Sequence, residues 1–163
     1  MTLSTVLRRT RSGRRPGRRD QRGAVAVEFA LIVPLLMLLV FGILEFGYML
    51  NRDTIVSNAS RDGARVASLH GEYQDIMHSI TSELAQSGIA TTSPTTVISI
   101  DCKKVDGTVC NAGGNATKYN TLAESGATAV ISISYTYSWI TPVISSIMGA
   151  STTLSQTTQM RVE

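Results

Sequence analysis

The feature that most restricts the fold of this chain is an apolar run near its N-terminus. From Ala24 to Leu44 the only charged residue is Glu28. A helix of this length rises about 31 Å, which is close to the hydrocarbon thickness of a bilayer. The alternative is a buried core helix, but a soluble chain of 163 residues could hardly bury a helix that is apolar on every side. The run therefore predicts a membrane-spanning helix over about residues 24–44.

The charges on either side of the run predict its orientation. Residues 1–22 carry eight arginines and one acid, whereas the rest of the chain carries seven Lys/Arg and eleven Asp/Glu. The formal net charge of +3 therefore reflects a basic leader, and it does not support nucleic-acid binding by the whole protein. Because positively charged flanks stay in the cytoplasm, we expect the leader inside and everything after Glu45 outside.

A secretory signal peptide has the same order of a basic segment and an apolar run. Two observations argue against this alternative. The run is longer than the usual apolar region of a signal peptide, about 7–15 residues. It also continues into Glu45-Phe46-Gly47 without a small-x-small cleavage site. We therefore expect the segment to remain as the anchor of a single-pass protein of the cytoplasmic membrane.

Glu28 is an unusual residue for such a segment. A carboxylate within an apolar span normally has a partner or a function. From its position alone two interpretations stay open. Glu28 either lies at the headgroup boundary and is hydrated, or it pairs with a positive charge.

Several motifs around the run occur in a fixed order. A glycine ends the basic leader, a glutamate is the fifth residue after it and an aromatic residue follows. A proline lies near the middle of the run, and a second Glu-Phe-Gly and an Arg-x-Gly-Ala-Arg stretch come later. These residues are Gly23, Glu28, Phe29, Pro34, Glu45-Phe46-Gly47 and Arg61-Asp62-Gly63-Ala64-Arg65. Together they resemble the TadE-like family of pseudopilins, from the tight-adherence (Flp) class of type IV pilus systems, although Asp62 stands where that family usually has glutamate.

The resemblance implies processing by a membrane-embedded prepilin peptidase, which would cut between Gly23 and Ala24. The cut would remove residues 1–23 and leave residues 24–163 as the mature chain. The freed α-amino group of Ala24 would then be the partner of Glu28, in the same chain or in a neighbouring subunit, since pairing offsets the burial of both charges. The other partners implied are pilins and pseudopilins, the inner-membrane pilus assembly platform and the lipid bilayer.

Beyond the run, helical spacing continues to about residue 70, which predicts one long helix over 24–70. Ala59, Gly63 and Ala67 form a stripe of small residues at a spacing of four, which permits close approach of another backbone. We expect this stripe to pack against the chain's own outer domain. Packing against another subunit is a second interpretation, and it does not exclude the first.

Residues 71–163 are expected to form a small exoplasmic α+β domain. An amphipathic stretch that ends at Ser87-Gly88 predicts a second helix, and Thr141-Pro142 opens a short one. Alternating apolar and polar residues predict strands, of which the one over 128–139 has the clearest pattern. The other two predicted strands span 97–100 and 151–162. Three strands of this kind most economically form an antiparallel sheet that shelters one face under the long helix.

The two cysteines, Cys102 and Cys110, are eight residues apart. Outside the membrane a disulfide between them is the default expectation. A metal site is not expected, because no histidine or further cysteine lies near enough in the sequence to complete a tetrahedral set. The sequence has no catalytic motif and no phosphate-binding loop, so we expect no catalytic residues and no cofactor.

These features favour a minor pilin or pseudopilin that acts in pilus assembly, priming or capping. The main alternative is a permanently anchored exoplasmic binding module that is never cleaved. The two hypotheses differ at Gly23, because only the pseudopilin requires the cut and the freed Ala24 amine. An anchored enzyme is disfavoured because the chain lacks a catalytic constellation.

Overall fold

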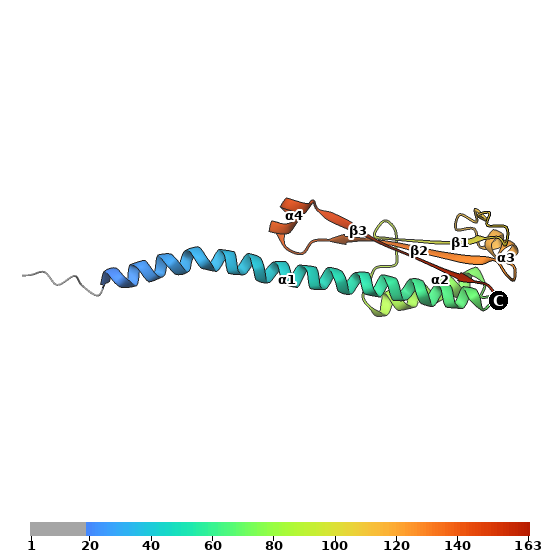
Figure 1. The fold of residues 1–163 in the computed structure, drawn as a ribbon, viewed down its shortest axis with the longest axis horizontal. Coiled ribbons are helices and arrows are strands. Elements are labelled where there is room, and N and C mark those ends of the chain that lie inside the picture. Colours follow the sequence, from blue (N-terminus) through green and yellow to red (C-terminus); the bar gives the residue numbers. More distant parts are fainter. Residues whose placement is uncertain (1–18) are drawn as a thin grey trace, which may run out of the picture. The chain divides into compact units, whose positions relative to one another are not determined.

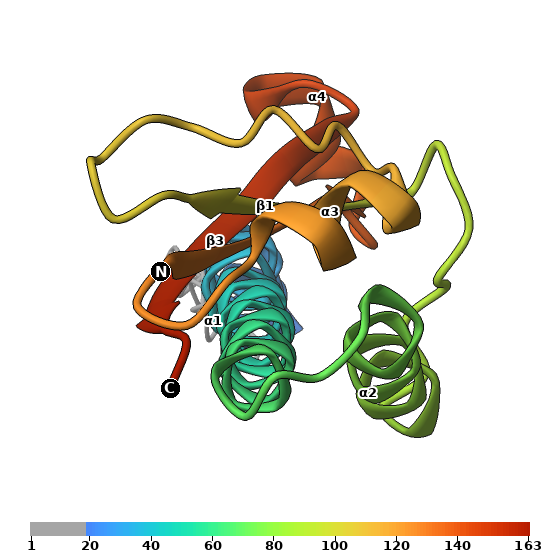
Figure 2. The ribbon, with the colours of Figure 1, turned by 90° about the vertical axis from the view of Figure 1, so that its right-hand side faces the viewer.

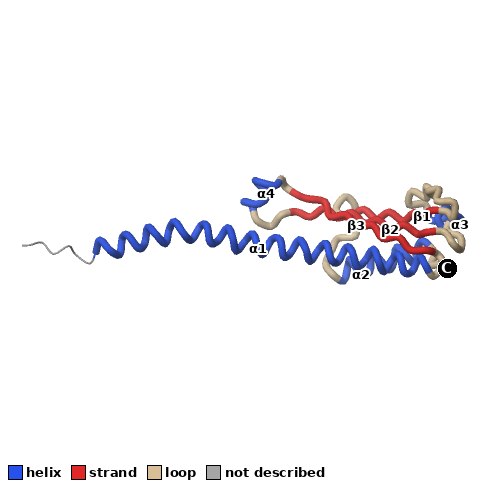
Figure 3. Tube along the Cα trace, in the orientation of Figure 1, coloured by secondary structure: helices blue, strands red, loops and turns tan. Residues whose placement is uncertain are grey.

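The computed structural model describes residues 19–163, so residues 1–18 of the predicted leader lie outside it. The described chain is α+β, with a long apolar N-terminal helix, a second helix and a three-stranded antiparallel sheet, which confirms the predicted fold class. Figures 1 and 3 show the order of the elements along the chain. Their bounds are α1 (Arg19–Ser68), α2 (Tyr73–Gln86), β1 (Thr96–Lys103), α3 (Ala116–Leu122), β2 (Thr128–Ser138), α4 (Pro142–Met148) and β3 (Ser151–Arg161).

Contacts within the chain divide it into two units, one up to Val40 and the other Phe41–Glu163. Helix α1 passes from the first unit into the second, and it continues through Pro34. In the first unit its apolar side chains are exposed; Leu31 and Leu35, for example, are 74% and 70% exposed. Among the described residues, α1 is the one helix long and apolar enough to span a membrane. An apolar surface of this size is stable only in apolar surroundings, as a bilayer provides.

The sheet has the strand order β1-β2-β3, so β2 is its central strand. In the register, Ile131 of β2 lies between Ile100 of β1 and Thr158 of β3. Side chains alternate between two faces along a strand. The inner face of β2 buries Ile131 and Ile133, whereas the alternate positions are only half-buried. This arrangement places one apolar face of the sheet against the helices.

The second part of α1 and helix α2 cover the inner face of the sheet. Figure 2 shows the two helices side by side below the strands. Helix α2 buries Ile76, Ile80 and Leu84 against this layer, and each buried side chain of this size contributes roughly 1.5–3 kcal/mol. The core therefore lies between two helices and one sheet, within the second unit.

The predicted stripe of small residues is part of this core. Ala59 and Ala67 are buried. A Cβ atom at Gly63 would lie 2.6 Å from side-chain atoms of Ile80, which is closer than real Cβ contacts. Gly63 therefore lies close against Ile80 of α2 in the same chain. Packing of the stripe against another subunit stays a prediction.

Gly63→Ala is expected to destabilise the second unit relative to Gly47→Ala in the same helix. Both variants gain the same helix propensity, about 1 kcal/mol. A Cβ at Gly47 would meet no other described atom within 4 Å, whereas a Cβ at Gly63 forces Ile80 to move. We expect the free energies of unfolding of the two variants to differ by about 1–3 kcal/mol. Denaturant unfolding of the full chain in detergent micelles measures this difference, and equal stabilities would contradict the close packing.

Candidate functional site

Glu45 is the one buried charged side chain among the described residues, with only 2% of its surface exposed. It is the first residue after the apolar run that ends at Leu44. An ionised carboxylate is costly to bury unless hydrogen bonds satisfy it. The hydrogen-bond partners of Glu45 are therefore the first groups to identify at this site.

Four hydrogen bonds reach the Glu45 carboxylate, all from the end of β2 and the start of α4. Tyr137 Oη and the Ile140 backbone N–H each donate to Oε1 at 2.8 Å. The backbone N–H and the Oγ1 hydroxyl of Thr141 each donate to Oε2 at 3.0 Å. Four donors on one carboxylate stabilise its ionised form. Glu45 thus connects α1 to the segment between β2 and α4. We call Glu45, Tyr137, Ile140 and Thr141 the Glu45 cluster.

Aromatic rings enclose this hydrogen-bonded cluster. Trp139 packs edge-on against Phe46 and Tyr137, with ring centroids 6.4 Å and 5.4 Å apart. Burial, and then the hydrogen bond to Glu45, raise the pKa of Tyr137. At neutral pH its phenol is protonated and serves as a hydrogen-bond donor to Glu45. Hydrogen bonds are stronger when water is excluded in this way. The arrangement is suited to holding two segments together.

The predicted processing residues lie in the first unit. Gly23, Ala24, Glu28 and Phe29 are all helical and exposed. Residues four apart on a helix are neighbours on one face, and Ala24 and Glu28 have this spacing. The structure therefore places the two residues of the predicted pair on one side of α1, and their pairing stays a prediction.

Cys102 and Cys110 form a disulfide that joins the end of β1 to the loop before α3. The neighbouring Asp101 accepts backbone N–H groups of Cys102 and Ala112, at 2.8 and 3.0 Å. Because each sulfur is bonded to the other, neither is a thiolate that could bind a metal. Asp101, Cys102 and Cys110 lie close together. The disulfide and the hydrogen bonds to Asp101 hold the loop before α3 against the end of β1.

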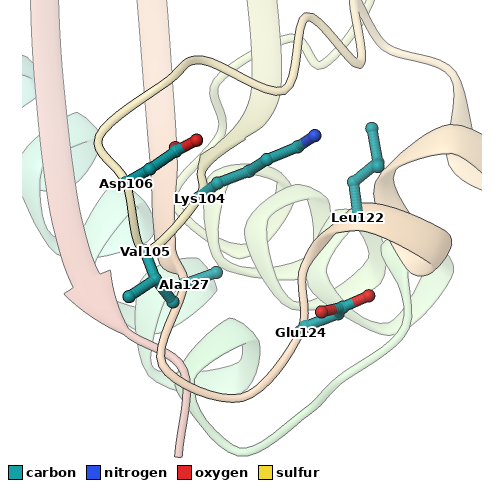
Figure 4. A pocket seen from close by; sticks show the side chains of 6 residues that line it. All are labelled: Lys104, Val105, Asp106, Leu122, Glu124 and Ala127. Atoms are coloured by element: carbon teal, nitrogen blue, oxygen red, sulfur yellow. The ribbon is translucent and has the colours of Figure 1, made fainter.

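A cavity of about 300 Å³ lies near the same end of the sheet. Figure 4 shows the six side chains that line it, which are Lys104, Val105, Asp106, Leu122, Glu124 and Ala127. Asp106 accepts the hydroxyl and the backbone N–H of Thr108, and these bonds hold its pKa below the ordinary value. The charged groups of the lining are the amine of Lys104 and the carboxylates of Asp106 and Glu124.

The described chain joins an exposed apolar helix to an α+β unit. Its class is therefore an α+β protein with an N-terminal helix that could span a membrane. Within that class, residues 23–65 match the family model described as TadE-like protein. The match confirms the TadE-like resemblance inferred from the motifs. The matched range includes Gly23, Glu28 and Glu45. No curated protein and no solved structure matches the chain.

Proposed function

We propose that this chain is a minor pilin or pseudopilin of a tight-adherence (Flp-type) pilus. In this proposal a prepilin peptidase cuts between Gly23 and Ala24, and the mature chain acts in pilus assembly, priming or capping. The observation that carries the proposal is the TadE-like match, which begins at Gly23 and extends over the apolar part of α1. The exposed apolar surface of that part supports it, because such a surface suits both lipid and the helices of other subunits.

Processing would change the charge at the start of α1. The arginine-rich leader holds the scissile bond at the cytoplasmic surface, because many positive charges cross a bilayer at great cost. Its removal discards this charge and leaves a single α-amino group on Ala24. That cation would pair with Glu28, within the chain or in a neighbouring subunit. The pair would allow the end of α1 to enter an assembly of low dielectric constant.

The proposed topology places the N-terminus in the cytoplasm and the α+β unit outside the cytoplasmic membrane. The Cys102–Cys110 disulfide supports this orientation, because disulfides persist in oxidising compartments and are rare in the cytosol. The proposed partners are the prepilin peptidase, other pilins and pseudopilins, and the inner-membrane assembly platform.

A permanently anchored binding module is the competing function. It would use the same span and the same outer unit, so the buried Glu45 cluster suits it equally well. The cut is the feature that separates the two, because a module that works as an anchored protein has no need of a free Ala24 amine.

Gly23→Phe should block the cut, whereas Gly23→Ala should still be processed. The reason is that a peptidase must fit the backbone at the scissile bond into a narrow cleft, and a bulky side chain prevents this. A Cβ at Gly23 would meet no other described atom within 4 Å, so neither variant disturbs the fold through that atom. The chain length in membranes, and the recovery of pilus subunits with each variant, measure the effect. An uncut Gly23→Phe protein that supports normal piliation would contradict the proposal and favour the anchored module.

A further inference from the structure

Helix α4 and the residue before it expose large apolar side chains. In contrast to α2, α4 buries none of its residues. We call four side chains the α4 surface; they are Ile140, Val143, Ile147 and Met148, which are 65%, 54%, 76% and 56% exposed. The sequence from residue 125 to residue 160 also contains no charged residue. An exposed cluster of this kind marks a contact with an apolar partner.

The Glu45 cluster determines where this surface lies. Its hydrogen bonds hold the backbone of Ile140 and Thr141 against the carboxylate of Glu45. Figure 1 shows α4 at the far end of the hairpin formed by β2 and β3, away from the C-terminus. The α4 surface is therefore fixed beside the first residue that follows the apolar run.

Helix α1 is also apolar and exposed at this level. The exposed apolar side chains within the second unit include Phe41, Ile43, Leu44 and Phe46. If α1 spans a bilayer over residues 24–44, the outer boundary of the hydrocarbon falls close to Glu45. The α4 surface and this part of α1 would then meet the same lipid layer.

We propose that the α4 surface inserts into the interfacial layer of the bilayer leaflet from which α1 emerges. This inference rests on the proposed membrane anchoring of α1. A short apolar helix lying in the interface buries its apolar face about 5–10 Å into the headgroup and acyl boundary. The segment has no charge to desolvate, and the hydroxyls of Ser145 and Ser146 donate to the backbone carbonyls of Pro142 and Val143, so they enter the interface already hydrogen-bonded. The second unit then contacts the membrane at two points, α1 and α4.

The absence of charge favours lipid over a charged protein partner and predicts binding to a zwitterionic surface. Attraction to anionic lipid requires basic residues, and the α4 surface has none. Seating at two points would also restrict the tilt of the outer unit. A subunit that leaves the bilayer for a filament must expose the α4 surface again or cover it with another subunit.

Photo-crosslinking of the full chain in phosphatidylcholine vesicles tests this inference. A benzophenone amino acid replaces Ile147 in one variant and Val105 in a second. These two side chains are matched, being 76% and 75% exposed, and Val105 lies beyond β1 in the loop that lines the cavity. A third variant carries the probe at Leu36, within the apolar run. Mass spectrometry then identifies each adduct as lipid or protein.

We expect lipid adducts at position 147 in a yield close to that at position 36 and several-fold above that at position 105. Suppose that position 36 gives lipid adducts but position 147 gives no more of them than position 105. This result would overturn the inference and would leave the membrane anchor in place. Adducts between two chains at 147, in place of lipid, would also overturn it and would assign the α4 surface to a second copy. A lack of lipid adducts at 36 would contradict the membrane anchor itself, and with it the proposed function.

Discussion

Glu45→Ala is expected to lower the free energy of unfolding of the second unit by about 3–5 kcal/mol. The substitution removes the acceptor of four hydrogen bonds and leaves the phenol of Tyr137 and the N–H groups of Ile140 and Thr141 without it. A buried donor that loses its partner costs about 1–3 kcal/mol, and more when the lost partner is charged. The loss should be felt at the α4 end of the sheet, because all the donors lie there.

Denaturant unfolding of the full chain in detergent micelles measures this loss, with the emission of the single tryptophan, Trp139, as the signal. Tyr137→Phe is the graded control, because it removes one hydrogen bond and leaves Glu45 with three. Its cost should be about 1.5–3 kcal/mol. Glu124→Ala removes an exposed carboxylate and should change stability by no more than about 0.5 kcal/mol. A Glu45→Ala chain as stable as the Glu124→Ala chain would show that the cluster does not hold α1 to the sheet.

Glu28→Gln should weaken the association of the processed chain with other pilin-like subunits by about 1–3 kcal/mol. The change removes the charge that would pair with the Ala24 amine but keeps the size of the side chain. A loss of 1.4 kcal/mol is a tenfold change in an equilibrium constant, so the expected drop in affinity is roughly 5-fold to more than 100-fold. Processing should continue, because Gly23 and the leader are unchanged.

Crosslinking or co-purification of processed Glu28→Gln protein with pilus subunits measures this effect. Glu28 is exposed in the first unit, so the stability of the second unit should equal that of the wild type. This equality is the control that separates docking from folding. If partner recovery and piliation were both unchanged, Glu28 would be a hydrated acid at the membrane boundary, and the anchored module would gain support.

Much of the fold could be predicted from the sequence because its signals are local. The period of two over 128–139 predicts β2, which the structure places at Thr128–Ser138. Thr141-Pro142 predicts the start of α4, and proline is its first helical residue. The long helix follows from an apolar run and the small-residue stripe. Each of these signals lies within one element and needs no knowledge of its neighbours.

Helix α3 and the second half of β1 could not be predicted in this way. Helix α3 is short and buries only Tyr119, so it has no apolar period to detect, although Asn115 caps it by accepting the Lys118 N–H. The predicted strand over 97–100 was too short, because the charged residues Asp101 and Lys103 interrupt the sequence pattern of β1. Pairing with β2 extends the strand to Lys103, and this pairing comes from residues far along the chain.

The role of Glu45 is the main feature of the site that the sequence analysis missed. Its place at the end of the apolar run and its Glu-Phe-Gly context are visible in the sequence. Its hydrogen-bond partners, however, are 92 to 96 residues away, and only the folded sheet brings them to it. A buried carboxylate of this kind depends on tertiary contacts that no local pattern records.

The intact mass of the native chain tests the central claim most directly. The protein is purified from membranes of cells with an active prepilin peptidase and from cells without one. The pseudopilin proposal predicts a chain of residues 24–163, beginning with the free amine of Ala24, when the peptidase is active, and residues 1–163 when it is not. Recovery of only the full-length chain from cells with active peptidase would contradict the proposal.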